Sequence, residues 1–78
     1  MFSTYVLFSH KLNKYYVGQT SDLKQRIIDH NAGRSKFTKT GRPWELVYHA
    51  ESQSRSEAIQ LETKIKGRGV TRYLKEST

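Results

Sequence analysis

The sequence contains no cysteine, so the protein can form neither a disulfide framework nor a thiolate metal site, and nothing ties it to an oxidising compartment. Long apolar runs are also missing, and the longest, residues 5–8, is far too short to cross a bilayer. The N-terminus lacks the basic region and the apolar segment of a secretory signal. We therefore expect a soluble, cytoplasmic protein with no membrane partner.

Acidic residues are scarce. The 78 residues include 7 Asp and Glu against 14 Lys and Arg, which leaves a net charge of +7. Such a charge attracts polyanions, and because the basic residues are spread along the chain they should lie on folded surface. The length allows one domain, residues 1–78, that buries only about 60% of its unfolded surface. Charge and aromatic content together favour a nucleic-acid partner over a merely well-solvated exterior.

Three stretches have the composition of β-strands. Residues 4–9 and 15–19 are rich in aromatic and β-branched side chains, and the polar residues between them are typical of a hairpin connection. The first stretch is apolar on both faces, which predicts a central strand covered on both sides. Residues 44–49 alternate as a third strand. Three large side chains are expected on one face of it: Trp44, Leu46 and Tyr48.

Helical periodicity begins after the predicted hairpin. Ser21 is a potential N-cap for a helix over residues 23–31, which Gly33 would stop. On a helical wheel, His30 lies inside the margin of the buried stripe and Arg26 lies on its flank. Neither side chain is expected to point freely into water.

A second helix is predicted from a capping box, Ser54 to Glu57, and should end at Gly67 and Gly69, while residues 70–75 predict a short closing helix. The predicted fold class is therefore α+β. It consists of a three-stranded antiparallel sheet flanked by helices, in the order β-β-α-β-α with a short C-terminal helix.

Glu62 stands out in the second helix because it falls at the edge of the apolar stripe that contains Ala58, Leu61 and Ile65. An ionised carboxylate at such a position requires an opposite charge, a set of hydrogen bonds or a metal ion. The surplus of positive charge suggests that the final ligand of the site is a phosphate.

Five residues, Tyr5, Tyr16, Arg26, His30 and Glu62, occur in the order and at the spacing of a known pattern, and together they resemble the GIY-YIG nuclease family. Tyr16-Val17-Gly18 closely matches the second family signature, and Ser3-Thr4-Tyr5 corresponds to the first, of which it shares only the tyrosine. Segment 33–48 looks like the small stand-alone members, which are related to the N-terminal nuclease domain of an excinuclease subunit. The remaining family positions are matched by Arg26, His30 and Glu62.

The resemblance implies hydrolysis of DNA phosphodiester bonds with one divalent metal ion, Mg²⁺ or Mn²⁺. Glu62 would bind the metal, because such a hard cation takes one or two carboxylate oxygens and completes its shell with water and phosphate. Tyr16 would position or activate the attacking water, which requires nearby positive charge to lower its pKa of about 10, and Arg26 would supply that charge and bind the scissile phosphate. Tyr5 and His30 would assist at the same site.

This site has a geometric condition. Tyr5 and Tyr16 share a face of the sheet only if the hairpin loop has an even number of residues; an odd number would bring Tyr15 to that face instead. The basic segment between Gly33 and Pro43 is expected to contact the DNA backbone. Its four candidate side chains are Arg34, Lys36, Lys39 and Arg42.

Each of these residues also has an ordinary structural explanation, and Glu62 could instead form an ion pair with Arg26. Within these 78 residues we find no match to the additional C-terminal asparagine or the separate DNA-binding domain of longer family members, so we expect backbone-directed binding with little base readout. The leading hypothesis is a metal-dependent endonuclease acting on DNA, in repair or recombination, with a dimer or a protein partner for duplex cleavage. The alternative is a nucleic-acid-binding module, for DNA or RNA, with the nuclease fold but little or no activity.

Overall fold

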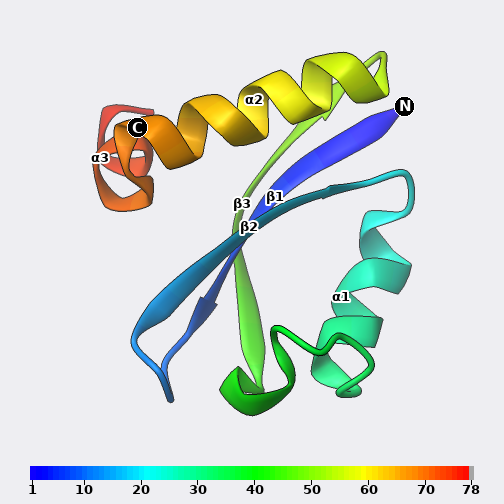
Figure 1. Ribbon diagram of the computed structural model, residues 1–78, viewed down its shortest axis with the longest axis vertical. Coiled ribbons are helices and arrows are strands. Elements are labelled where there is room, and N and C mark those ends of the chain that lie inside the picture. Colours follow the sequence, from blue (N-terminus) through cyan, green and yellow to red (C-terminus); the bar gives the residue numbers. More distant parts are fainter. Residues whose placement is uncertain (78) are drawn as a thin grey trace.

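The structure, a computed structural model, describes residues 1–77 and contains a three-stranded sheet in the order β2-β1-β3, with β1 antiparallel to both neighbours (Figure 1). The elements are β1 (Phe2–Ser9), β2 (Lys14–Thr20), α1 (Leu23–Asn31), the short 3-10 helix η1 (Lys39–Gly41), β3 (Trp44–Ser52), α2 (Arg55–Arg68) and α3 (Val70–Glu76). The predicted α+β class, element order and central first strand are confirmed. Among residues 1–77, no helix is long and apolar enough to span a membrane.

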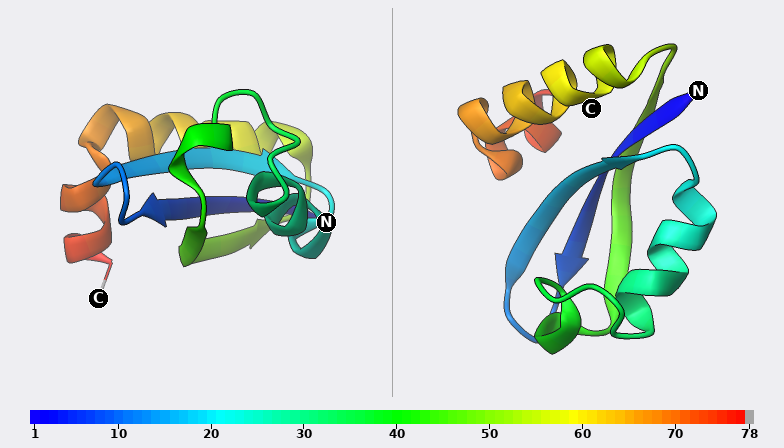
Figure 2. Two further views of the ribbon diagram at one scale, coloured as in Figure 1. Left: turned by 90° about the horizontal axis from the view of Figure 1, so that it is seen from below. Right: turned by 45° about the vertical axis from the view of Figure 1, so that its right-hand side comes forward.

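The sheet has a separate apolar cluster on each face. In the right-hand view of Figure 2 the strands pass between α1 on one side and α2 with α3 on the other. Tyr5 and Leu7 of β1 pack with Trp44 and with the α1 stripe, whereas Val6 and Val17 pack with Ile65 of α2. Because the side chains of β1 alternate between the two faces, this one strand supplies the centre of both clusters.

The β1–β2 hairpin meets the geometric condition for the predicted site. Ser9 pairs with Lys14, so residues 10–13 form a loop with an even number of residues. Leu7 pairs with Tyr16 and Tyr5 pairs with Gly18. Tyr5 and Tyr16 therefore lie on the same face of the sheet, and Tyr15, which pairs with Phe8, lies on the opposite one.

The third strand differs from its predicted pattern because it contains a β-bulge. Leu46 pairs with Leu7, but Tyr48 pairs with Val6. The two partners in β1 are adjacent, whereas those in β3 are separated by one extra residue, Val47. Tyr48 consequently joins the cluster beneath α2 and α3, where its hydroxyl lies 3.1 Å from that of Tyr73. The prediction that Tyr48 shares a face with Trp44 and Leu46 was therefore wrong.

The helix boundaries follow their capping residues. The N-cap of α1 is Asp22 rather than Ser21, because Asp22 Oδ1 accepts a hydrogen bond from Gln25 N at 3.2 Å. Ser54 caps α2 as predicted and accepts from Glu57 N at 3.2 Å. Gly67 remains inside α2, and only Gly69, with φ of 91°, separates α2 from α3. A positive φ is a conformation that glycine adopts without steric cost.

Candidate active site

Tyr5 and His30 form the buried centre of the candidate site. The Tyr5 hydroxyl lies 3.0 Å from His30 Nε2, and the other ring nitrogen, Nδ1, lies 2.6 Å from Thr38 Oγ1. Thr38 is held in turn by Trp44, whose Nε1 donates to the Thr38 carbonyl oxygen at 2.6 Å. Both Tyr5 and His30 are almost completely shielded from solvent. This hydrogen-bonded chain fixes the Tyr5 hydroxyl relative to α1 and to the segment that follows it.

Tyr16 lies beside this pair and remains partly accessible. Its ring centroid is 5.0 Å from that of His30 and 6.3 Å from that of Tyr5. Gly18, the last residue of the Tyr-Val-Gly motif, allows this arrangement, because a Cβ there would lie 2.6 Å from Tyr5 Oη and 3.2 Å from Tyr16 Cε2. The motif thus needs glycine for space, since the Tyr5 hydroxyl passes directly over the backbone of β2.

Arg26 of α1 supplies the positive charge of the cluster. Its guanidinium interacts with the hydroxyl of Tyr5 and, more weakly, with that of Tyr16, and the interaction with Tyr5 is the main reason that the pKa of Arg26 is raised. Burial raises the pKa of the Tyr5 phenol above its usual value, although the interaction with Arg26 opposes this shift. Tyr5 is therefore protonated at neutral pH and acts as a hydrogen-bonding group.

His30 is neutral at neutral pH. Burial is the largest cause of its lowered pKa, and the charge of Arg26 lowers the pKa further. A neutral imidazole has one donor and one acceptor nitrogen. One ring nitrogen of His30 therefore donates to the hydroxyl of Tyr5 or Thr38, and the other nitrogen accepts from the second hydroxyl. The sequence placed His30 only at the margin of the buried stripe; in the structure it is completely buried.

Glu62 is not part of the hydrogen-bonded cluster. Its Oε2 accepts from Lys66 Nζ at 2.7 Å, one turn further along α2, and its side chain is 22% exposed. Its charge nevertheless reaches Tyr5, where it makes the smallest contribution to the raised pKa. The structure thus brings Tyr5, Tyr16, Arg26 and His30 together and places Glu62 within electrostatic range, paired with Lys66 instead of Arg26.

The donor set around Glu62 fits a hydrated cation better than a cage built by the protein. Among residues 1–77 there is no group of three or more His, Cys, Asp and Glu side chains that could hold a metal ion. Within the same residues, Glu62 Oε1 makes no hydrogen bond, so one carboxylate oxygen is available. Mg²⁺ keeps several waters and needs only one or two carboxylate oxygens beside substrate phosphates, and Glu62 can satisfy that requirement.

The four candidate DNA-contacting residues are all exposed, but they are not equivalent. Arg34 Nη1 donates to Asp29 Oδ1 at 2.8 Å, and this contact is the main cause of the lowered pKa of Asp29. Arg42 Nε donates to the carbonyl oxygen of Lys39 at 2.9 Å. In the described part of the chain, the ammonium groups of Lys36 and Lys39 have no ion pair. Most of the positive charge available to a ligand on this segment therefore comes from the two lysines and Arg42.

Sequence reasoning missed Thr38, which joins His30 to the backbone of the following segment. No pattern in the sequence could have shown this role, because it depends on how the segment between α1 and β3 folds back beneath the helix. The segment is anchored near the hairpin as well, since Ser9 Oγ donates to the Gly41 carbonyl oxygen at 2.7 Å.

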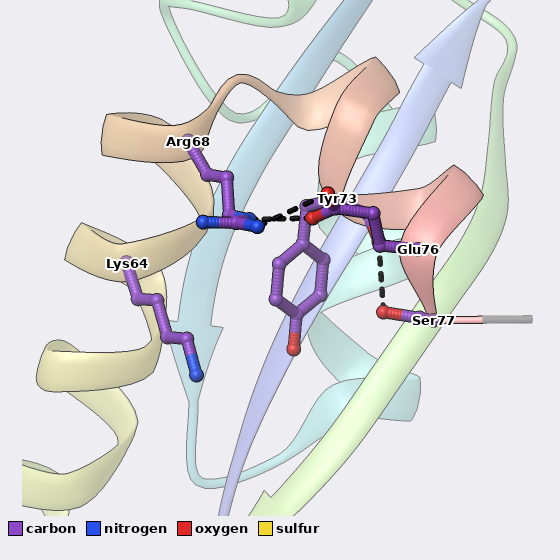
Figure 3. A pocket seen from close by; sticks show the side chains of 5 residues that line it. All are labelled: Lys64, Arg68, Tyr73, Glu76 and Ser77. Carbon is purple, nitrogen blue, oxygen red and sulfur yellow. Dashed lines mark hydrogen bonds and ion pairs between the residues drawn. The ribbon is translucent and has the colours of Figure 1, made fainter.

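A separate hollow lies between α2 and α3 (Figure 3). It has a volume of about 450 Å³ and is lined by Lys64, Arg68, Tyr73, Glu76 and Ser77. Arg68 and Glu76 are joined across it, with Nη2 and Oε2 3.0 Å apart. None of the predicted site residues lines this hollow, so it is not the candidate active site.

The structure is therefore a small α+β domain in which two tyrosines of an antiparallel three-stranded sheet lie beside an arginine and a histidine of the first helix. Residues 1–73 match the GIY-YIG catalytic domain, and the chain belongs to this family.

Curated relatives carry the name UPF0213. The UPF0213 protein SH2523 of Staphylococcus haemolyticus is 47% identical over 57 residues, which are 72% of this chain and 70% of that protein. The UPF0213 protein lwe0147 of Listeria welshimeri is 44% identical over 55 residues, and the match covers 69% of this chain but only 61% of that protein.

A solved structure has the same fold. The solution NMR structure of the UPF0213 protein BH0048 from Bacillus halodurans is similar with a TM-score of 0.58 at 28% sequence identity. The similarity covers 99% of this chain and 83% of that one. The arrangement of sheet and helices is therefore shared with this relative across the described residues.

Proposed function

We propose that the protein is a metal-dependent endonuclease that hydrolyses DNA phosphodiester bonds. The observation that carries the proposal is the meeting of Tyr5, Tyr16, Arg26 and His30 from three different elements at one face of the sheet. An arginine and a neutral, fully hydrogen-bonded histidine beside two phenols form a polar cluster of the kind that functional sites contain. Membership of a nuclease family supports the same conclusion.

Arg26 is the group that would bind the scissile phosphate. Its planar fork of donors matches two phosphate oxygens, and its interaction with both phenols keeps it at the site before substrate arrives. During hydrolysis negative charge accumulates on the non-bridging phosphate oxygens, and a fixed guanidinium stabilises that charge without reorganising.

Tyr16 is the phenol that would position the attacking water, because it remains partly accessible whereas Tyr5 is buried. The water oxygen forms a bond to phosphorus while the bond to the ester oxygen breaks. The attacking water releases one proton to solvent, and the leaving oxygen takes up one proton from solvent. Tyr5 and His30 hold the hydroxyl network beside this water in one arrangement. Mg²⁺ or Mn²⁺ bound through Glu62 would supply further charge neutralisation at the phosphate.

The rest of the surface suits binding to the DNA backbone. The exposed lysines among residues 1–77 can contact phosphates, and binding through phosphates carries little direct readout of bases. Such an enzyme suits structured intermediates of repair or recombination in the cytoplasm better than site-specific cutting. Cleavage of both strands of a duplex would require a dimer, a protein partner or two binding events.

A nuclease assay with a matched charge control tests the proposal. Labelled DNA of several structures is incubated with wild type, Glu62→Gln and Glu45→Gln, each with Mg²⁺, with Mn²⁺ and with chelator. Glu45 is an exposed carboxylate on β3, so Glu45→Gln makes the same change of charge away from the site. We expect cleavage by wild type and Glu45→Gln only with metal, and none by Glu62→Gln.

The second candidate is a nucleic-acid-binding module with little activity, and the ion pair between Glu62 and Lys66 favours it, because a lysine competes with a cation for the carboxylate. This candidate predicts that wild type and Glu62→Gln bind every DNA or RNA equally and leave it equally intact. That result would refute the endonuclease proposal.

A further inference from the structure

Phe37 is the most exposed large apolar side chain among the described residues, with 84% of its surface accessible. No other aromatic residue in this part of the chain exceeds the 38% of Tyr15. Single exposed apolar residues are common and need no explanation when they lie on mobile or featureless surface. Phe37 needs one because the backbone that carries it is firmly held.

The segment around Phe37 is a turn with buried ends. Thr38 N donates to the Ser35 carbonyl oxygen at 3.3 Å, which makes Lys36 and Phe37 the two central residues of the turn. Ser35 and Thr38 are both buried. A turn closed in this way projects its central side chains outward, so the Phe37 ring is displayed by a fixed support.

This support is part of the candidate active site. Thr38, the residue after Phe37, is joined by its hydroxyl to His30 and by its carbonyl oxygen to Trp44. His30 is joined in turn to Tyr5. Phe37 is therefore adjacent in the chain to a residue of the hydrogen-bonded chain that fixes the catalytic candidates Tyr5 and His30.

The charges around the ring identify what it would bind. Lys36 precedes it in the turn and Lys39 follows, and both carry ammonium groups without an ion pair among the described residues. An apolar protein partner would require further apolar surface around the ring, whereas the charged side chains nearest to Phe37 in the sequence, Lys36 and Lys39, are exposed and cationic. A ring between cations is the arrangement that stacks on a base while lysines contact the adjacent phosphates.

We propose that Phe37 stacks on an unpaired base of the DNA substrate and so directs the enzyme to single-stranded or branched DNA. The proposal rests on the proposed function and adds the substrate class to it. In a regular duplex every base is stacked on its neighbours and presents no free face to the ring. Unpaired nucleotides at flaps and gaps present such a face at the lowest unstacking cost.

Equilibrium binding without metal separates this proposal from catalysis. Fluorescence anisotropy at low salt compares a labelled single strand, the matching duplex and the same duplex with a single-stranded flap. The proteins are wild type, Phe37→Ala, Phe37→Trp and Ile59→Ala. Ile59 is an exposed apolar residue of α2, and its truncation controls for general loss of apolar surface.

We expect Phe37→Ala to weaken binding of the single strand and the flap by about 5- to 150-fold, the loss typical for one stacked base, and to leave duplex binding unchanged. Phe37→Trp should restore the preference and, compared with wild type, whose one tryptophan is Trp44, show additional quenching of tryptophan fluorescence on the single strand. Ile59→Ala should match wild type. Thermal unfolding of all variants should be alike because both side chains are exposed.

Three outcomes would overturn the inference. Phe37→Ala could weaken duplex and single strand equally, or could leave all three affinities unchanged, and either would exclude stacking. A change in oligomeric state without a change in DNA affinity would assign the ring to a protein interface instead. If wild type binds none of the DNA molecules, the proposed function itself fails; if it binds them independently of Phe37, only the inference fails.

Discussion

Gly18→Ala should destabilise the protein even though the backbone at this position is ordinary. A Cβ on Gly18 would lie 2.6 Å from Tyr5 Oη and 2.8 Å from Tyr5 Cζ, whereas ordinary contacts begin at 3.4 Å. The phenol ring must therefore retreat by about 0.8 Å within a buried site that is already closely packed. Overpacking of this kind costs about 1–3 kcal/mol of unfolding free energy. Loss of the hydrogen bond to His30 would add about 1 kcal/mol.

Urea unfolding followed by circular dichroism measures this change in the free energy of unfolding. A second glycine provides a control substitution that should raise the free energy of unfolding instead of lowering it. A Cβ on Gly67, inside α2, would have no neighbour within 4 Å. Gly67→Ala should therefore stabilise the protein by about 0.5–1 kcal/mol, because alanine loses less backbone entropy in a helix. If Gly18→Ala is as stable as wild type, the close approach of Tyr5 to β2 is wrong.

A double-mutant cycle identifies the atom responsible. Tyr5→Phe removes the nearest atom, Oη, while it keeps the ring, so Gly18→Ala should cost less in that background than in wild type. Equal costs in both backgrounds would show that the hydroxyl does not limit the space above Gly18.

Three further predictions concern charge and capping. The free energy of unfolding should decrease as the pH falls below about 6.5, because the unfolded chain takes up a proton that buried His30 resists, and urea titrations of His30→Gln should show a shallower pH slope. Lys39→Gln should reduce the slope of log affinity for DNA against log salt by about 1, and Arg34→Gln by less because Arg34 is already paired with Asp29. Ser54→Ala should destabilise the protein by about 0.5–2 kcal/mol in thermal or urea unfolding, whereas a similar loss in Ser56→Ala would contradict the capping role of Ser54.

Local patterns predicted most of the fold. Aromatic and β-branched composition identified the first two strands, alternation identified the third, and the capping box at Ser54 placed the start of α2, because all these signals depend on neighbours in the sequence. The position of Tyr48 could not be predicted, because a bulge in β3 is decided by its pairing with β1. The sequence also could not show that Asp22 caps α1 instead of Ser21. The two residues are adjacent, both types are common N-caps, and only the backbone geometry distinguishes them.

The candidate site was predictable to a similar degree. Family spacing identified two tyrosines, an arginine and a histidine, and the structure brings all four together. The contact between His30 and Thr38 was not predictable, since it depends on the path of an irregular segment. The partner of Glu62 was also missed, although Lys66 lies at the i+4 position, where oppositely charged side chains commonly pair on a helix.

The extra residue in β3 has a consequence for tolerance to changes in length. Val47 is the extra residue between Leu46, which pairs with Leu7, and Tyr48, which pairs with Val6. Its removal would leave both of these pairs in place. A one-residue deletion at Val47 would then straighten the strand while every later side chain kept its orientation. The same deletion in the middle of β1 would invert the remainder of that strand and exchange its inward and outward residues. Variation in chain length among proteins of this fold should therefore be accommodated at the bulge and excluded from the central strand.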